Sequence, residues 1–344
     1  AVVGARGSDP DGISVAGAVY LYERNAGGTN KWGQVAKLTA ADKASGDIFG
    51  SSVSVGGDVV LVGAYEASPG GMTYGYAGAV YVFERNAGGT NAWGQVAKLT
   101  AADKAAYDYF GRSVSVAGDV ALIGANQASP DGATAAGAAY VFERNAGGTN
   151  KWGQVAKLTA PDKVAWDYFG YSVSAAGDVA LVGAYRADPG GLSNAGAAYV
   201  FERNAGGTNK WGQVAKLTAS DKSASDEYGI SVSVAGDVAM IGAYGKSPGG
   251  LSYAGAVYVY ERNAGGTNAW GEVARLVASD KATGDYFGYS VSVAGDVALI
   301  GACNADPGGV SCAGAAYLFE GLINTVEAPA SEISVLGTNG AAIA

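Results

Sequence analysis

Apolar and polar residues alternate along the chain in short runs, and the same order of runs recurs every 59 to 61 residues. Residues 49–55 and residues 93–99 alternate with a period of two, as half-buried strands do. Residues 58–64 and residues 78–84 form nearly continuous apolar runs, which are typical of strands buried on both faces. No segment places its apolar residues at a spacing of 3.6. The pattern therefore predicts four β-strands per repeat and argues against a helical repeat.

The connections between these runs favour antiparallel pairing. The first is a short Gly-Gly-Asp or Ala-Gly-Asp turn, and the third is the longer loop at 86–91, Asn-Ala-Gly-Gly-Thr-Asn, whose glycines allow left-handed backbone. The phrase Glu-Arg-Asn-Ala-Gly-Gly-Thr-Asn-(Lys/Ala)-Trp-Gly contains Trp32, Trp93, Trp152, Trp211 and Trp270 in turn. Four antiparallel strands repeated at this spacing describe the blade of a β-propeller.

Counting the strands predicts the number of blades. The second and third strands of the repeat occur six times, whereas the Phe-Gly strand that opens each repeat occurs five times. The divergent tail at 321–344 contains residues 332–337, which are similar to residues 289–293 and can supply the missing strand. We therefore predict an all-β fold in which residues 1–344 form a single six-bladed β-propeller of four-stranded antiparallel blades, closed by this tail. A seventh blade from sequence outside this chain is the alternative.

The composition excludes several classes of protein. Charged residues make up 15% of the chain, the net charge is −9, and histidine is absent. An acidic chain of this kind does not suit nucleic acid, whose binding needs clustered lysine and arginine. We find no apolar run long enough for a membrane span. The first five residues are interpreted as a strand inside a repeat, so any secretory signal is expected to be removed or to lie upstream.

Three short motifs carry a resemblance to a known family. A Phe-Gly pair (Phe49-Gly50) is followed about 13 residues later by Gly-Ala (Gly63-Ala64) and then by Gly-Ala-Val-Tyr-Val-Phe at 78–83. This order resembles the FG-GAP repeat, which builds the N-terminal β-propeller of integrin α-chains and of related bacterial, algal and fungal proteins. The resemblance covers the chain to about residue 320. It implies a propeller, and its members include adhesion receptors and sugar-binding proteins.

The resemblance also implies calcium, because many FG-GAP repeats bind that ion between the first and second strands. Calcium requires six to eight oxygen ligands. Here each such turn retains one acidic residue: Asp58, Asp119, Asp178, Asp237 or Asp296. We therefore expect the family calcium site to be lost, and we predict no cofactor and no metal.

Two aspartates five residues apart recur in the loop that leads to the next blade. The pairs are Asp42 and Asp47, Asp103 and Asp108, Asp162 and Asp167, Asp221 and Asp226, and Asp280 and Asp285. A metal site or a catalytic carboxylate pair is conceivable. We favour turn-capping hydrogen bonds to nearby backbone N–H groups, because a ring has one centre and a catalytic pair would not be copied into five blades.

Two cysteines, Cys303 and Cys312, occur in the sixth repeat and nowhere else. They flank a predicted hairpin loop, where cross-strand Cα atoms are close enough for a disulfide. We predict that bond, which would imply an oxidising compartment. Two free buried thiols are the alternative.

The repeats differ from one another mainly in the loops at one end of the predicted ring. The candidate ligand-binding residues there are Tyr65, Tyr107, Asn126, Trp166, Tyr185, Arg186 and Tyr244. Aromatic surfaces with a few polar groups suit sugars or protein partners. Tyr109, Tyr168 and Tyr286 directly precede the Phe-Gly strands and either belong to this site or pack between blades.

These patterns predict a non-catalytic binding module, secreted or on the cell surface, of the adhesion or carbohydrate-binding (lectin-like) type. Its expected partner is a glycan or an extracellular protein. The absence of histidine and of a unique acid–base cluster argues against an enzyme. A polysaccharide-acting enzyme on a propeller scaffold is nevertheless one alternative, and a structural repeat scaffold without a small ligand is another.

Overall fold

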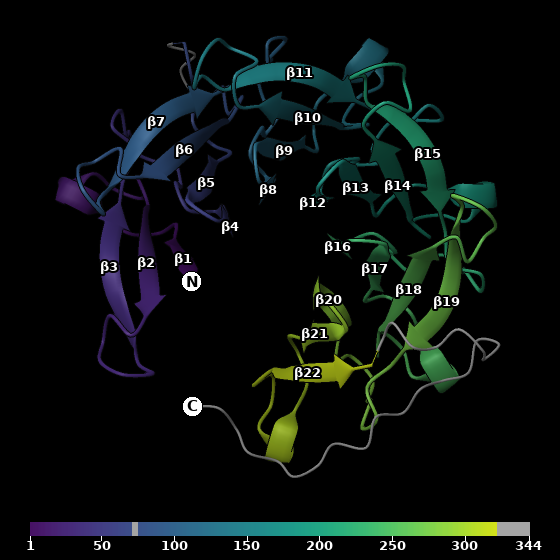
Figure 1. Cartoon of the computed structure of the whole chain (residues 1–344). Helices are drawn as coiled ribbons and strands as arrows, with labels where there is room; N and C mark the ends of the chain where they lie inside the picture. Colours follow the sequence, from purple (N-terminus) through teal and green to yellow (C-terminus); the bar gives the residue numbers. More distant parts are fainter. Residues whose placement is uncertain (71–74, 322–344) are drawn as a thin grey trace.

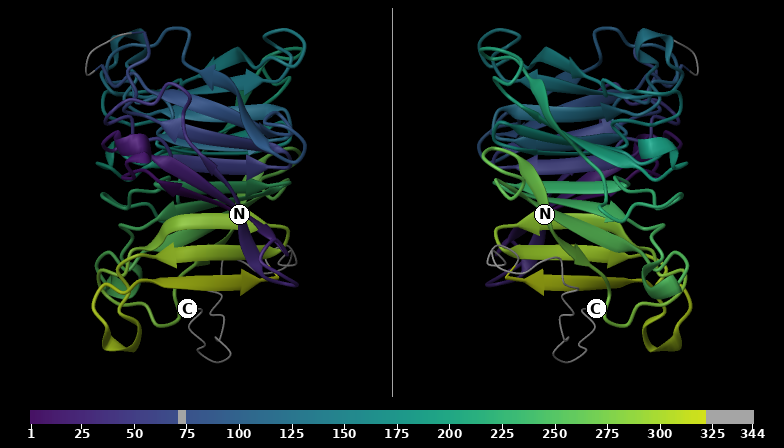
Figure 2. Two further views of the ribbon diagram at one scale, coloured as in Figure 1. Left: turned by 90° about the vertical axis from the view of Figure 1, so that its left-hand side faces the viewer. Right: turned by 90° about the vertical axis from the view of Figure 1, so that its right-hand side faces the viewer.

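The computed structural model describes residues 1–70 and 75–321, which form six antiparallel sheets arranged as blades around a central axis (Figure 1). Within each sheet the strands follow one another in sequence order from the axis outward. Loops project from both ends of the ring in the side views of Figure 2. The predicted all-β propeller with six blades is therefore confirmed.

Blades 1 to 3 contain eleven strands in the described residues. They are β1 (Val2–Ala5), β2 (Ala18–Arg24) and β3 (Trp32–Leu38); β4 (Ser52–Gly56), β5 (Val59–Ala64), β6 (Ala79–Arg85) and β7 (Trp93–Leu99); and β8 (Ser113–Ala117), β9 (Val120–Ala125), β10 (Ala138–Glu143) and β11 (Gly153–Leu158).

Blades 4 to 6 continue the same order. They are β12 (Ser172–Ala176), β13 (Val179–Ala184), β14 (Ala197–Glu202) and β15 (Gly212–Leu217); β16 (Ser231–Ala235), β17 (Val238–Ala243), β18 (Ala256–Arg262) and β19 (Trp270–Leu276); and β20 (Phe287–Ala294), β21 (Val297–Ala302) and β22 (Ala315–Glu320). Five of the proline turns form short 3-10 helices: η1 (Pro10–Gly12), η2 (Pro130–Gly132), η3 (Pro189–Gly191), η4 (Pro248–Gly250) and η5 (Pro307–Gly309).

The four middle blades have the predicted four strands, whereas blades 1 and 6 contribute three each from the described residues. Blade 1 begins with a second-type strand, β1, as the count of motifs predicted. The tail that was predicted to complete this blade lies outside the described residues.

The hydrophobic core lies between successive blades. At the junction of blades 2 and 3, Val80 and Val82 pack against Phe110 and Tyr140, and all four are at most 1% exposed. The rings of Phe110 and Tyr140 meet edge to face with centroids 5.5 Å apart. Burying one such side chain contributes about 1.5–3 kcal/mol, so each junction stabilises the ring substantially.

Close backbone contact between blades explains the glycines of the Phe-Gly and Gly-Ala motifs. The amide of Gly111 donates to the carbonyl of Gly124 within blade 3 at 2.9 Å. A Cβ atom on Gly63 of blade 2 would lie 2.2 Å from the carbonyl oxygen of Gly111. No larger residue fits there, so these glycines set the spacing between blades.

Among the described residues, no helix has the length and hydropathy needed to cross a membrane.

Candidate functional site

One end of the ring carries a series of tyrosine and arginine side chains around the axis. We call Tyr65, Arg112, Tyr171, Tyr185, Tyr244 and Tyr289 the axial cluster. Three of them directly follow the second strands β5, β13 and β17, and the others stand at the start of the innermost strands β8, β12 and β20. The first and second strands of a blade are antiparallel, so the second strand ends at the same end of the ring at which the first strand begins. The fold therefore brings these positions together at one end of the axis (Figure 1).

Arg112 connects three blades within the axial cluster. Its guanidinium carbon lies 5.4 Å from the ring centroid of Tyr65 in blade 2 and 4.6 Å from that of Tyr171 in blade 4. Its Nη2 atom also donates a hydrogen bond of 2.8 Å to the hydroxyl of Tyr171. A guanidinium held between two aromatic faces is attracted by both rings, which fixes its position.

Tyr185 continues the cluster within blade 4. Its ring centroid lies 4.6 Å from that of Tyr171, and it stacks on Tyr168 at 5.8 Å with an interplanar angle of 24°. The exposed guanidinium of Arg186 lies 5.2 Å from the ring of Tyr168 and 5.5 Å from that of Tyr185. Burial raises the pKa of Tyr185 to about 12, so its hydroxyl remains a hydrogen-bond donor at neutral pH.

Tyr244 links blade 5 to blade 6. Its ring lies 5.2 Å from that of Tyr286 and 5.7 Å from that of Tyr289. Burial and a hydrogen bond to Glu227 raise the pKa of Tyr244. The Oε2 atom of Glu227 is buried without a hydrogen-bond partner among the described residues.

Tyr107 and Trp166 lie further from the axis and are each 53% exposed. Both have left-handed backbone, with φ of 66° and 73°. The equivalent residues in two other repeats are glycines, Gly46 and Gly284, with φ of 81° and 85°. A bulky residue at such a position costs free energy that glycine avoids, so the backbone alone favours glycine here.

The structure unites most of the predicted site residues. Tyr65, Tyr185 and Tyr244 are members of the axial cluster. Arg186 and Trp166 both contact Tyr168, the latter with centroids 6.3 Å apart. Tyr107 joins through ring contacts that run from Tyr107 to Tyr76, then to Tyr109 and then to Tyr65. Tyr109, Tyr168 and Tyr286, whose role the sequence left open, are half-buried and contact the tyrosines of this site.

Asn126 does not join these rings. It is 4% exposed, and its Oδ1 atom has no hydrogen-bond partner among the described residues. Its position is that of Tyr65, Tyr185 and Tyr244 in the other blades. Asn126 therefore lies at the expected place without making the ring contacts of its equivalents.

Sequence reasoning missed four residues of this surface: Arg112, Tyr171, Glu227 and Tyr289. Three of them follow the Phe-Gly or Tyr-Gly pair directly, a position that varies from repeat to repeat. The residues there are Ser51, Arg112, Tyr171, Ile230 and Tyr289. This variation could have identified the position, because it differs from the uniform Ser-Val alternation that follows it.

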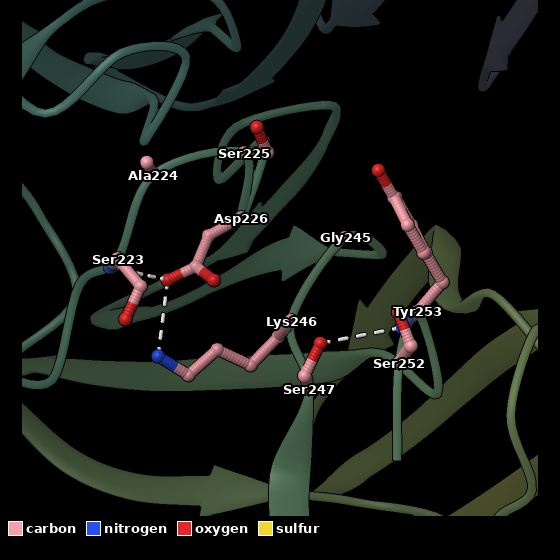
Figure 3. A pocket seen from close by; sticks show the side chains of 9 residues that line it. All are labelled: Ser223, Ala224, Ser225, Asp226, Gly245, Lys246, Ser247, Ser252 and Tyr253. Atoms are coloured by element: carbon pink, nitrogen blue, oxygen red, sulfur yellow. Dashed lines mark hydrogen bonds and ion pairs between the residues drawn. The ribbon is translucent and has the colours of Figure 1, made fainter. Parts of the chain in front are cut away.

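A cavity of about 290 Å³ lies at the same end of the ring, in blade 5 (Figure 3). Asp226 and Lys246 form an ion pair of 3.0 Å along its wall, and their side chains are only 5% and 8% exposed. Lys246 also donates to the backbone carbonyl of Asp221 at 2.5 Å. Burial raises the pKa of the Asp226 carboxyl, and the bond from Lys246 opposes this. Tyr253 in the lining reaches the axial cluster through Tyr286, whose ring centroid lies 6.0 Å from that of Tyr253 and 5.2 Å from that of Tyr244.

Lys246 is a fifth residue that sequence reasoning missed. Four of the other five repeats have alanine at this position, Ala67, Ala128, Ala187 and Ala305, and the first repeat has Ser8. A lysine in place of the alanine of four other repeats was the sequence feature that could have marked blade 5 as different.

The second aspartate of each pair has the turn-capping role that we favoured, whereas the first joins two blades. The second of each pair accepts a backbone N–H from three residues earlier, as Asp108 does from Ala105 at 2.7 Å. The first accepts the hydroxyl of a tyrosine in the next blade, as Asp103 does from Tyr140 at 3.0 Å. The same two bonds recur at Asp42 and Asp47, Asp162 and Asp167, Asp221 and Asp226, and Asp280 and Asp285.

The predicted disulfide is not present in the structure, where Cys303 and Cys312 are free, exposed thiols. The previous blade shows a physical reason. Its equivalent residues, Tyr244 and Tyr253, both contact Tyr286, whose ring from the next blade stands between them. In blade 5 the two positions are therefore held apart by an aromatic ring, so they are not adjacent across the hairpin as the sequence analysis assumed. The alternative of buried thiols is also wrong, since both are exposed.

Within the described residues, no group of three or more acidic, histidine or cysteine side chains could hold a metal ion. The single acid in the turn between the first and second strands has another partner. Asp58 pairs with Arg85 at 3.1 Å and Asp178 with Arg203 at 2.7 Å. The loss of the family calcium site stays a prediction.

Comparison with known proteins assigns the repeat. The family model described as the FG-GAP repeat matches five segments, at residues 32–83, 93–142, 152–201, 211–260 and 270–319. Each matched segment begins with the outermost strand of one blade and ends with the third strand of the next. A search of curated proteins finds no match to the chain. Because the matched segments cover more than half of the sequence, the chain belongs to the FG-GAP repeat family.

Proposed function

We propose that this protein is a non-catalytic binding module that acts outside the cell or on its surface, with a glycan as its ligand. The observation that carries the proposal is the presence of exposed Tyr107 and Trp166 on left-handed backbone where two other repeats have glycine. Backbone strain of this kind concentrates at functional sites. We therefore infer that these two side chains contact the ligand.

The chemistry of the surface supports a sugar ligand. The flat faces of Trp166 and Tyr107 can stack on the apolar faces of pyranose rings, and rigid aromatic side chains lose little entropy on binding. The hydroxyl of Tyr185 stays protonated at neutral pH and can donate to a sugar oxygen. The exposed guanidinium of Arg186, held on two tyrosine rings, can form paired hydrogen bonds with a carboxylate or sulfate substituent.

A catalytic role receives less support. Glycosidases use two carboxyl groups that face the bond to be cleaved. The buried acid–base pair in the blade 5 cavity, Asp226 and Lys246, is occupied in its own ion pair and in bonds to backbone groups. Its neighbours in the lining are mostly serine and glycine.

The test is a glycan array that includes neutral and uronic-acid or sulfated sugars. The double variant Trp166→Ala with Arg186→Ala should lose at least tenfold in affinity for any glycan that the unchanged protein binds, while its thermal stability stays the same. Val164→Ala is the matched control, because Val164 is 61% exposed in the same loop and carries no ring.

Three results would contradict the proposal. Turnover of a polysaccharide by purified protein, abolished by one substitution, would favour the enzyme. An array without binding, together with the absence of a protein partner, would favour a structural scaffold. Retained binding in the double variant would place the ligand elsewhere.

A further inference from the structure

Small residues open the cavity of blade 5 where other repeats have large ones. Ser225, with φ of 64°, takes the place of Tyr107 and Trp166 in two other repeats. Gly245 takes the place of Arg186, and a Cβ atom there would lie 2.0 Å from the carbonyl oxygen of Ser225. The two loops are therefore in close backbone contact, and their short side chains leave the space of about 290 Å³ beside Lys246 open.

The polar groups in the lining have hydrogen-bonding capacity that the protein does not use. The hydroxyls of Ser223, Ser225 and Ser252 form no hydrogen bond with another described residue. Asp226 accepts the amide of Ser223 at 2.7 Å and the ammonium of Lys246 at 3.0 Å, both through Oδ2. Its Oδ1 atom has no partner in the part of the chain that the structure describes. These groups surround the cavity in Figure 3 and can bind a ligand that carries several hydroxyls.

The charged side chains in the lining compensate each other. They are Asp226 and Lys246, which form the ion pair described above. Lys246 also lies 3.4 Å from the carboxylate of Asp221. A ligand with its own charge would lose hydration on entry and would find no unpaired opposite charge in this lining. The cavity therefore favours a neutral ligand.

Tyr253 adds a flat apolar surface to the hydroxyls. It is 41% exposed and lies on the side of the cavity opposite Ser223 (Figure 3). Its amide donates to the hydroxyl of Ser247 at 3.3 Å, and its ring is in contact with that of Tyr286. A fixed aromatic ring beside free hydrogen-bonding groups matches a pyranose, which has an apolar face of C–H groups and hydroxyls around its edge.

We propose that this cavity binds a single neutral sugar residue, whose ring packs on Tyr253 and whose hydroxyls bond Asp226 and the serines. The volume of about 290 Å³ equals that of roughly ten water molecules, which suits one ring and excludes a longer chain from the cavity itself. The free oxygen of Asp226 would accept a sugar hydroxyl in a charge-assisted hydrogen bond.

A second cavity in the same position of blade 2 shows what is particular to blade 5. It has about 270 Å³, but Ala44 and Ala67 stand there in place of Ser223 and Lys246. The space therefore recurs, whereas the polar lining does not. The inference also goes beyond the proposed glycan surface, because Trp166 and Arg186 are not part of this lining.

Titration with single sugars tests the site. The probes are the methyl glycosides of glucose, galactose and mannose and those of the three corresponding uronic acids, and binding is followed by saturation-transfer NMR. We expect at least one neutral sugar to bind with millimolar affinity, as is usual for so small a ligand. Its uronic acid should bind at least about fivefold more weakly, because the lining has no unpaired cation.

A double variant locates the sugar. Ser223→Ala with Ser252→Ala removes two of the free hydroxyls and should weaken binding at least about fivefold. The fold should tolerate the first change, since three other repeats have alanine there. The matched control is Ser45→Ala with Ser193→Ala, two serines of the corresponding loops outside this lining, and it should bind the sugar as the unchanged protein does.

Several results would overturn the proposal: no millimolar binding of any neutral sugar, a preference for the uronic acids, or equal affinity in the Ser223/Ser252 variant and its control. Trp166→Ala with Arg186→Ala separates this site from the proposed glycan surface. That variant should bind the single sugar as before even if the proposed glycan surface proves wrong. Loss of the sugar in it would place the ligand outside the cavity and would also overturn the proposal.

Discussion

Individual residues in this repeat array are most informative where one copy departs from the others. Trp166 shows this most clearly, because Gly46 and Gly284 hold the equivalent position with the same left-handed backbone. A non-glycine residue in that region costs roughly 1–3 kcal/mol. The proposed glycan contact would give a tryptophan at this strained position a use.

The first prediction follows from that strain. Trp166→Gly should unfold at the same temperature as the unchanged protein or at a higher one, because relief of the strained backbone offsets the extra freedom of glycine in the unfolded chain. Trp166→Ala keeps the strained backbone and should not gain stability. Thermal melts of both variants check this, and a clearly lower melting temperature for Trp166→Gly would show that the side chain stabilises the fold.

The second prediction concerns Lys246. Breaking a buried ion pair by removing one partner commonly costs about 3–5 kcal/mol. Here Lys246→Ala should cost only about 1 kcal/mol, because Asp226 retains the backbone bond from Ser223. Blades 2 to 4 already combine alanine at this position with a buried aspartate and need no lysine. Urea denaturation measures the difference, and a loss of 3 kcal/mol or more would show that the ammonium is essential to blade 5.

At the scale of elements, each junction between blades is held by the same polar contacts around an apolar centre. Asp103, in the loop after blade 2, accepts hydrogen bonds from Tyr140 and Lys157 of blade 3, at 3.0 and 2.5 Å. Burial alone would raise the pKa of the Asp103 carboxyl, but these two bonds outweigh it and lower that pKa. The carboxylate form is therefore the one that joins the blades.

The third prediction takes its sign from this lowered pKa. A carboxyl whose pKa is lower in the folded state contributes stability above its unfolded pKa, near 4, and loses that contribution as pH falls through the folded pKa. The unchanged protein should therefore be more stable than Asp103→Asn at pH 7, and the difference should shrink below about pH 3. Melting temperatures of the two proteins across this range test it. A difference that does not change with pH would show that charge is not the cause.

At the same scale, the sequence predicted elements well and side-chain partners poorly. Strand positions and turns followed from the period of two and the glycines, because these depend on local geometry. The second aspartate of each pair was interpreted correctly as a turn cap, whereas the first bonds a tyrosine of the next blade, a partner that the sequence did not reveal. The disulfide was predicted wrongly: Cys303 and Cys312 are free thiols, and their equivalents in blade 5 both contact a ring of the next blade, which the local sequence does not reveal. Arg112 was missed for the same reason, as its ring partners are in two other blades.

At the scale of the whole molecule, the described structure consists of blades whose cores are shared between neighbours. Phe169, for example, is 0% exposed and packs among residues of blades 3 and 4. Its ring contacts those of Tyr199 and Phe201. No blade therefore has a core of its own, and the blades should unfold together.

The fourth prediction tests that coupling. Phe169→Ala should destabilise the protein by about 3–5 kcal/mol, the usual cost of removing a buried phenylalanine. Hydrogen exchange measured by mass spectrometry should show faster global opening in peptides from blades 2 and 5 as well as from blades 3 and 4. Faster exchange confined to blades 3 and 4 would instead indicate that stability is local, as in an open solenoid.

The offset between the family repeat and the blade has a consequence for how such a chain can change in length. Each matched segment holds the last strand of one blade and three strands of the next, so it spans a junction. Duplication of one segment inserts a blade together with both halves of a compatible contact, and deletion removes them together. Every other junction is left as it was. Recombination among nearly identical copies can therefore vary the number of blades freely, and closure of the ring is the step at which an unsuitable number is rejected.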